Sequence, residues 1–188
     1  MFSNESKITR EVDASSRFQA SLPTSSDRLL QKLDEWGIRY KCYHHAPLRT
    51  VEESKNIQHR FLQTSQGGGH IKNLFLRDHK KNNFLLVVEQ DRSVDLKNIK
   101  QVFASGRLSF GSPDRLMERL GVRPGAVTPF SMVNGVKNNV KLFIDASLRS
   151  CLKIYAHPLV NDRTLELSIQ ELEKFFTKIG AVPSWVDL

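Results

Sequence analysis

The strongest constraint on the fold is a pair of strand-like segments at residues 71–78 and 83–91. The first reads "IKNLFLRD" and the second reads "NFLLVVEQD", and the polar stretch "HKKNN" between them has the composition of a turn. We therefore expect a β-hairpin. Its second strand contains an uninterrupted apolar run, which indicates a strand that is buried on both faces of a sheet.

Helical and strand-like segments follow one another irregularly around this hairpin. The spacing of apolar residues and the capping residues predict helices near 28–36, 95–103, 113–122 and 168–180, and a short helix starting near residue 50. Further strands are predicted near 38–45, 107–112, 139–149, 151–158 and 164–168. This order lacks the regular βαβ alternation of a doubly wound fold. We therefore expect an α+β fold, a single domain with a central mixed, mostly antiparallel sheet flanked by helices.

Length and composition fit one globular domain with a polar extension. The chain has 188 residues, of which 39% are hydrophobic and 26% charged. Residues 1–25 show few periodic apolar positions, so we expect weak order there and a folded domain over 26–188. No apolar run approaches the roughly 20 residues that span a bilayer, and no secretory signal is visible. The expected location is the cytoplasm, without membrane attachment.

The charge of the chain favours a polyanionic partner. Lys and Arg number 28 against 20 Asp and Glu, which gives a net charge of +8 and an isoelectric point of about 9.7. Such a balance suits nucleic acid, although a merely basic surface has the same composition. The basic residues between positions 80 and 141 form no continuous block. This dispersion favours a surface that positions a large anion over a disordered basic tail.

Lys72 is the first candidate for chemistry. It follows the glycines at 67, 68 and 69 in "GGGHIK", which has neither the spacing of a P-loop nor that of a dinucleotide-binding loop. A flexible connector followed by a solvated lysine is the simplest interpretation of that pattern. Strand alternation, however, places Lys72 on the same face as Leu74, and Asn73 on the other face. If Leu74 points into the core, Lys72 points inward and needs an anionic or carbonyl partner.

The loop "RPGAVTPF" is the second candidate, because Gly125 and Pro129 frame a G-x-x-x-P segment. Glycine permits unusual backbone dihedrals, and Pro129 fixes the conformation at the end of the segment. Consecutive exposed N–H groups in such a loop can hold a carbonyl or carboxylate oxygen. An ordinary surface loop would have the same pattern.

The other polar candidates are isolated in sequence. His157 ends a predicted strand, where a histidine with satisfied hydrogen bonds is the commoner outcome, and Asp145 lies in an apolar strand and needs a hydrogen-bond partner. Cys42 and Cys151 are too far apart for metal-type spacing, and the histidines lack the i, i+4 zinc pattern. We therefore expect no metal and no cofactor.

Four segments, in this order, resemble the YbaK/ProX superfamily of aminoacyl-tRNA deacylases, which is related to the editing domain inserted in bacterial prolyl-tRNA synthetases. The segments are "YHHAPLRTVEE", "HIKNLFLRDHKKNNFLLVV", "GAVTPFSMVN" and "IDASL…IYAHPLVNDRTLELS". The resemblance runs from about residue 29 to residue 179. The motifs "KNLFL" and "HPLVN" are more similar to the freestanding Ala-tRNA(Pro) deacylase branch than to the Cys-tRNA(Pro) branch.

The resemblance implies roles for individual residues. Lys72 matches the lysine regarded as essential, and His157 matches the histidine associated with the amino-acid pocket. The loop from Gly125 onwards matches the segment that orients the substrate, and the amides of Gly125 and Ala126 would stabilise the oxyanion. The glycines at 67–69 are interpreted as slack beside the pocket. Residues expected to support substrate binding are Asn73, Val127, Thr128, Pro129, Asp145, Ser147, His157 and Asn161.

The implied reaction is hydrolysis of the ester between alanine and the terminal adenosine of mischarged tRNA(Pro). Lys72 would hold the phosphate or ester region, water would attack with help from a ribose hydroxyl, and a small pocket would exclude proline. The implied partners are the acceptor end of tRNA(Pro) and prolyl-tRNA synthetase. Two alternatives stay open: a catalytically inactive tRNA- or synthetase-binding module of the same fold, and a deacylase for Cys or Ser.

Overall fold

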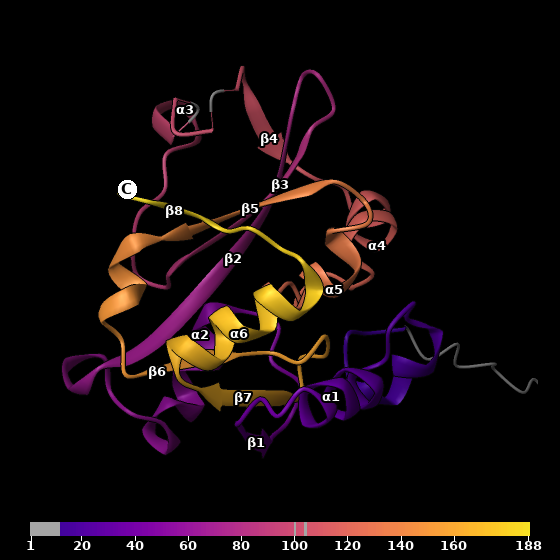
Figure 1. The fold of residues 1–188 in the computed structure, drawn as a ribbon, viewed down its shortest axis with the longest axis vertical. Helices are drawn as coiled ribbons and strands as arrows, with labels where there is room; N and C mark the ends of the chain where they lie inside the picture. The colour runs from indigo at the N-terminus through magenta and orange to yellow at the C-terminus, as the bar shows by residue number, and fades with distance from the viewer. Residues whose placement is uncertain (1–11, 100, 104) are drawn as a thin grey trace, which may run out of the picture.

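The computed structural model describes residues 12–99, 101–103 and 105–188, which form an α+β domain around one mixed sheet (Figure 1). The strand order is β1-β7-β6-β2-β3-β5-β8, and β4 pairs with β2 outside this path. The strands are β1 (Lys41–His44), β2 (Gly68–Asp78), β3 (Asn83–Glu89), β4 (Leu108–Phe110), β5 (Val140–Asp145), β6 (Lys153–Ala156), β7 (Arg163–Leu167) and β8 (Ser184–Val186).

The predicted hairpin and the mixed character of the sheet are both confirmed. β2 and β3 pair in antiparallel orientation, with Ile71 opposite Glu89 and Arg77 opposite Asn83. The pairs β1–β7, β7–β6 and β2–β4 are also antiparallel, whereas β6–β2, β3–β5 and β5–β8 are parallel. Every residue of β3 except Glu89 is buried, as the apolar run predicted. The short β8, which pairs with β5, was not predicted.

Helices cover the sheet and complete the core. The α-helices are α1 (Ser26–Glu35), α2 (Val51–Ile57), α3 (Leu96–Ile99), α4 (Pro113–Leu120), α5 (Met132–Gly135) and α6 (Ile169–Ile179); the 3₁₀ helices are η1 (Ser16–Ser21), η2 (Gln58–Arg60), η3 (Thr64–Gln66), η4 (Pro129–Ser131) and η5 (Ala146–Ser150). In α6, Leu172, Phe175 and Phe176 are buried as the helical spacing predicted. Among the described residues, no helix is both long enough and apolar enough to cross a bilayer.

The core lies in two clusters, one on each side of β2. Phe75 packs with residues of α1, α4 and α6 in the larger cluster, whereas Leu76 belongs to a smaller cluster with Phe84 and Phe103. Side chains alternate between the two faces along a strand. Both faces of β2 are therefore packed against apolar residues.

The glycine run is a site of close packing, which corrects the interpretation of slack. Gly68 and Gly69 are buried and pair with β6 in β2. A Cβ atom on Gly68 would lie 1.8 Å from the Leu62 carbonyl oxygen, and one on Gly69 would lie 2.5 Å from Ile154 Cδ1. Only glycine lets the backbones approach this closely. Gly67 itself has a φ of 96°, in the left-handed region that favours glycine.

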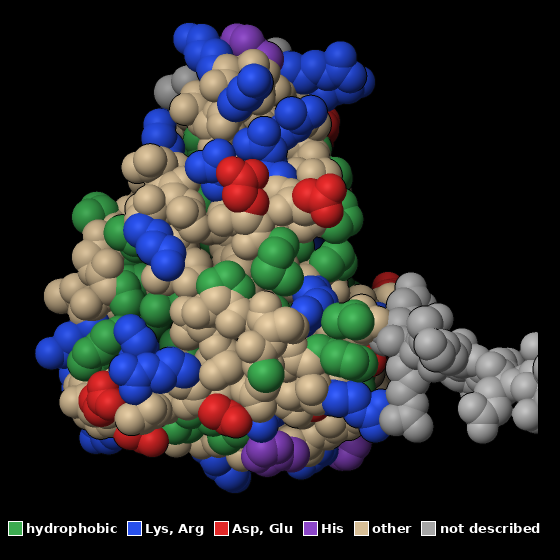
Figure 2. Space-filling view, turned by 90° about the vertical axis from the view of Figure 1, so that its right-hand side faces the viewer, with side chains coloured by type: hydrophobic (Ala, Val, Ile, Leu, Met, Phe, Trp, Pro, Cys, Tyr) green, Lys and Arg blue, Asp and Glu red, His purple; other side chains and the backbone are tan. Residues whose placement is uncertain are grey.

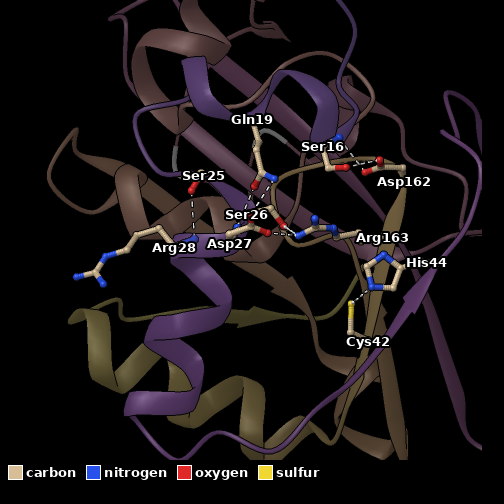
Figure 3. Close-up of polar contacts among 10 residues, drawn as sticks. All are labelled: Ser16, Gln19, Ser25, Ser26, Asp27, Arg28, Cys42, His44, Asp162 and Arg163. Carbon is tan, nitrogen blue, oxygen red and sulfur yellow. Dashed lines mark hydrogen bonds and ion pairs between the residues drawn. The ribbon is translucent and has the colours of Figure 1, made fainter.

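The segment before α1 packs against the domain from residue 12 onwards. Residues 1–11 of the expected extension lie outside the described residues, but Ala14 and Leu22 are buried. The Ser16 N–H and hydroxyl donate to the Asp162 carboxylate at 2.9 and 2.6 Å (Figure 3). Residues 12–25 therefore pack against the domain, held in part by the Asp162 carboxylate and by the Asn161 N–H, which donates to the Ala14 carbonyl.

Candidate active site

A small cavity lies where α2, β2, β6 and β7 meet. We call it the His157 cavity; its volume is about 50 Å³, and its lining includes His157, Asn73, Ile57, Leu48 and Thr164. A water needs roughly 10–15 Å³ of cavity space on this scale. The cavity therefore has room for a few waters or for a small side chain.

His157 follows β6 and presents an unprotonated nitrogen. Its Nδ1 lies 2.8 Å from the Arg163 carbonyl oxygen. Because a carbonyl only accepts, Nδ1 carries the proton, and Nε2 of the neutral ring is left as an acceptor. Burial lowers the pKa of His157, which keeps the ring neutral at pH 7.

Contacts in the N-terminal half of the chain hold Arg163, the first residue of β7, whose carbonyl binds His157. The Arg163 guanidinium lies 2.5 Å from Asp27 and donates to the Ser26 hydroxyl at 3.2 Å (Figure 3). Both partners lie at the start of α1. The carbonyl that sets the His157 tautomer therefore belongs to a residue whose side chain is held in place by α1.

Asn73 supplies a second acceptor to the same cavity. Its Oδ1 is buried and has no hydrogen-bond partner among the described residues. Asn73 shares a face of β2 with Ile71, which also lines the cavity. A buried polar atom without a partner costs about 1–3 kcal/mol. The Asn73 Oδ1 is therefore free to accept a hydrogen bond from a water or a ligand in the cavity.

An aromatic stack forms one wall of the cavity. Tyr155 stacks on Phe61 with ring centroids 4.6 Å apart and on His70 at 5.0 Å. The Tyr155 hydroxyl accepts from the Leu62 N–H at 2.8 Å, and burial raises the pKa of Tyr155 to about 12. These contacts anchor the chain that enters β2 at the glycines.

Lys72 lies on the opposite face of β2 from Asn73, as strand alternation predicted. It faces the smaller cluster with Leu74, and the cavity lining includes Asn73 but not Lys72. Its Nζ donates to the Arg92 carbonyl, which is the kind of partner that an inward lysine requires. The structure therefore does not bring Lys72 into the cavity that His157 lines.

Lys72 belongs instead to a network with two other predicted residues. The Arg92 guanidinium lies 2.6 Å from Asp145, whose side chain is only 1% exposed. Asp145 also accepts from the Ser147 N–H at 3.0 Å and from its hydroxyl at 2.7 Å. Ser147 is thus a donor to a carboxylate, and the Lys72–Arg92–Asp145 chain joins β2 to the end of β5.

The predicted G-x-x-x-P loop lines a neighbouring cleft. Gly125 has a φ of 88° and lines a cleft of about 330 Å³ together with Asn161, Arg49 and Arg123. We call it the Gly125 cleft. A Cβ on Gly125 would lie 3.9 Å from the Leu48 carbonyl oxygen, and Leu48 also lines the His157 cavity. The two spaces are therefore separated by the thickness of one chain segment.

The other residues of the loop are turned inward. The Ala126 N–H donates to the Arg123 carbonyl at 3.0 Å, so it is already used within the turn. Thr128 and Pro129 are buried at the start of η4, and Val127 packs against the larger cluster. Asn161 is buried, and its Oδ1 has no hydrogen-bond partner among the described residues. Gly125 and Asn161 are thus the predicted residues that face the cleft.

Several residues of the cavity wall could not be predicted from the sequence. Gln58 and Gln90 form a reciprocal amide pair at 2.7 and 3.2 Å, and Ser54 and Thr164 add hydroxyl groups. They come from separate segments that only the folded chain brings together. No cluster of three or more His, Cys, Asp or Glu side chains suited to a metal occurs among the residues that the structure describes.

Comparison with known proteins shows the family of the chain. The aminoacyl-tRNA editing domain family matches residues 45–175. The prolyl-tRNA editing protein ProX of Acetoanaerobium sticklandii is 38% identical, over 81% of this chain and 90% of that protein. A prolyl-tRNA synthetase associated domain-containing protein 1 of Xenopus laevis is 36% identical, over 82% of this chain and 92% of that protein.

A solved structure shares the fold. It is described as a candidate trans-editing enzyme for prolyl tRNA synthetase, and it aligns with a TM-score of 0.64 over 88% of this chain and 98% of that chain at 20% identity. The protein is an aminoacyl-tRNA deacylase, a hydrolase that cleaves the ester between an amino acid and tRNA. The chain belongs to the aminoacyl-tRNA editing domain family, as the four ordered segments indicated.

Proposed function

We propose that this protein is a trans-editing hydrolase that deacylates mischarged Ala-tRNA(Pro) at the terminal adenosine. The observation that carries the proposal is a cavity of about 50 Å³ in which two acceptors, on Asn73 and His157, await a donor. The names of the relatives support tRNA(Pro) as the nucleic acid and prolyl-tRNA synthetase as an associated protein. The proposal places the reaction in the cytoplasm, where mischarged tRNA is made.

The two acceptors suit the α-ammonium group of an aminoacyl ester. An ammonium group has three N–H donors and no acceptor, so it can satisfy Asn73 Oδ1 and His157 Nε2 together. Hydrogen bonds to a charged group contribute about 1.5–3 kcal/mol each. A neutral histidine is essential to this role, because a protonated ring would offer a second donor and repel the ammonium.

The size of the cavity supports alanine as the amino acid. A methyl side chain fits a space of about 50 Å³, and the proposal takes the bulkier ring of proline to clash with its walls. A cavity that excludes the larger cognate residue by steric clash works as a size filter. Ser54 and Thr164 place hydroxyl groups in the same lining, and this observation favours serine or cysteine as second candidate substrates.

The ester lies, in this proposal, between the His157 cavity and the Gly125 cleft. Gly125 donates its N–H to the developing oxyanion, while Ala126 holds the turn through its bond to Arg123. Asn161, which faces the cleft, binds the adenosine end, and water attacks with help from a ribose hydroxyl. The loop is held in place by its inward-facing residues Val127, Thr128 and Pro129.

Lys72 is assigned to the phosphate or ester region of the terminal adenosine. Its ammonium has a neutral carbonyl partner, and a charge-assisted bond to an anionic phosphate is stronger. Asp145 and Ser147 support this assignment indirectly, because Asp145 fixes Arg92, whose carbonyl holds Lys72. Because Lys72 lies on the face of β2 opposite Asn73, this assignment requires its side chain to leave the Arg92 carbonyl when the tRNA end binds.

The test is deacylation of Ala-, Ser-, Cys- and Pro-tRNA(Pro) by the intact protein. We expect rapid loss of alanine and no loss of proline. Lys72→Ala should lower kcat/KM about 10- to 100-fold, since one hydrogen bond to a charged group is lost, while Lys178→Ala on the exposed end of α6 should not. Absence of activity on all four substrates would refute the enzyme proposal, and an inactive protein that still binds tRNA would point to the binding module.

A further inference from the structure

Four cations gather at the tip of the β2–β3 hairpin and on the adjoining chain. Arg77, Lys80 and Lys81 lie in or beside the turn, and Arg107 immediately precedes β4, which pairs with β2 next to Arg77. All four side chains are exposed. Figure 2 shows Lys and Arg side chains gathered at the end of the molecule where Figure 1 places this hairpin. We call these four residues the hairpin-tip surface.

This charge is not neutralised inside the protein. Among the described residues, none of the four cations takes part in an ion pair. The nearby carboxylate of Asp78 is buried, and it accepts from the Asn82 N–H at 2.9 Å and from Nδ2 at 2.7 Å. Cations that share one surface without counter-charges repel one another, so an external anion would stabilise the arrangement.

The surface is concave, and one of its lysines occupies a costly conformation. Arg77, Lys81 and Arg107 line a hollow of about 340 Å³, together with Asp78, whose carboxylate is hydrogen-bonded to Asn82. Lys81 has a φ of 65°, in the left-handed region that favours glycine or asparagine. A lysine at a turn position that favours glycine suggests that the side chain has a use of its own.

We propose that the hairpin-tip surface binds the phosphate backbone of the same tRNA whose aminoacyl end enters the His157 cavity. The proposal rests on the proposed function for the identity of the RNA. β2 connects the two places: Asn73 lines the cavity and Asp78 ends the strand, five residues or roughly 17 Å farther along at about 3.3 Å per residue. A single tRNA can therefore occupy both places.

Contacts of this kind set affinity and orientation without reading sequence. Lys and Arg bind phosphate oxygens and release counterions, so the affinity falls steeply with salt. The cavity would then select the amino acid, while the hairpin-tip surface would hold the nucleic acid.

The test compares two triple variants that remove the same charge. Lys80→Gln/Lys81→Gln/Arg107→Gln changes the proposed surface, and Lys32→Gln/Lys174→Gln/Lys178→Gln changes α1 and α6 at a distance from it. Affinity for uncharged tRNA(Pro) is measured by fluorescence anisotropy over about 50–200 mM salt. We expect the first variant to bind about tenfold more weakly or worse, with a salt slope reduced by about 3, and the second to bind much as the wild type does.

Two further measurements separate the possible explanations. Hydrolysis of 3′-O-alanyl-adenosine, which is too short to reach the tip, should be equal in the wild type and in the first variant. Lys81→Asn should raise the melting temperature, because asparagine tolerates this φ, and yet weaken tRNA binding. That combination would exclude unfolding as the cause of weaker binding.

Several outcomes would overturn the assignment. One is an equal loss of tRNA affinity in both triple variants, and another is slower hydrolysis of alanyl-adenosine in the first variant. A third is an affinity for polyglutamate as high as for tRNA, which would indicate that the partner of this surface is an acidic protein. If the protein had no deacylase activity but the first variant still bound tRNA more weakly than the wild type, the hairpin-tip surface would be supported and the proposed function would be refuted.

Discussion

At the scale of single residues, Asn73 has the features of a residue that binds a ligand and not of one that stabilises the fold. Its Oδ1 is buried without a partner, so the free protein carries a polar group that it does not satisfy. Asn83, on the neighbouring strand, is buried as well, but its Oδ1 accepts from Arg115 at 3.0 Å and its Nδ2 donates to the Lys81 carbonyl at 3.2 Å. The two asparagines are therefore a matched pair with opposite expectations.

Replacing Asn73 by leucine should leave the free energy of unfolding unchanged or raise it by about 1 kcal/mol, because an unsatisfied group is removed. Deacylation of Ala-tRNA(Pro) should fall about tenfold or more. Asn83→Leu should instead lower the free energy of unfolding by about 1–3 kcal/mol, because it leaves the partners of Asn83 unpaired. Urea unfolding and a deacylation assay measure both effects. Equal destabilisation by the two substitutions would contradict the assigned role of Asn73.

Only part of this arrangement can be predicted from the sequence. Strand alternation predicted that Lys72 and Asn73 point to opposite faces of β2, and the structure confirms it. Alternation could not tell which face bears the cavity, because both faces of β2 are packed by apolar clusters. Residues such as Gln90 and Thr164 could not be predicted, since their positions depend on pairings between distant segments.

At the scale of elements, the start of β2 depends on the absence of side chains at Gly68 and Gly69. The β2–β3 hairpin can be predicted from its apolar residues and the composition of its turn, because both are local properties of the sequence. The glycine run was interpreted as slack because the sequence does not show what lies against it. β8 was missed for a related reason: three residues that pair with β5 at the far end of the chain leave almost no periodic signal.

Gly68→Ala should lower the free energy of unfolding by about 3 kcal/mol or more, because its Cβ would lie 1.8 Å from a backbone carbonyl that must move. Gly180→Ala is the control. Gly180 ends α6 at a φ of 71°, and a Cβ there meets nothing within 4 Å, so the cost is only the backbone strain of about 1 kcal/mol. Thermal unfolding of the two variants tests this, and a mild effect at Gly68 would show that the segment is loose after all.

At the scale of the whole molecule, buried and half-buried histidines link stability to pH. Burial lowers the pKa of His45, His70 and His157 below the ordinary value of 6.5. Below pH 6.5 the unfolded chain takes up protons at these positions while the folded chain does not yet do so. The unfolded state then binds more protons, and the free energy of unfolding falls as the pH falls.

We therefore expect nearly constant stability between about pH 7 and 8 and a steady decline below pH 6.5. The decline should continue until the pH reaches the lowered pKa values of the folded protein. Urea unfolding at pH 7.5, 6.5 and 5.5 measures it, and His70→Gln should make the decline shallower because one titrating group is removed. Stability that stayed flat from pH 7.5 to 5.5 would show that these rings are not held neutral by the fold.

The close backbone contacts at Gly68 and Gly69 have a consequence for how discrimination arises. Because they join the entry of β2 to the Leu62 carbonyl and to β6, the walls of the His157 cavity lose their conformational freedom during folding and not during binding. In the proposed function, the substrate would then meet a space that is already organised before binding. The free protein would therefore already have the cavity shape that excludes a larger amino acid, before any tRNA binds.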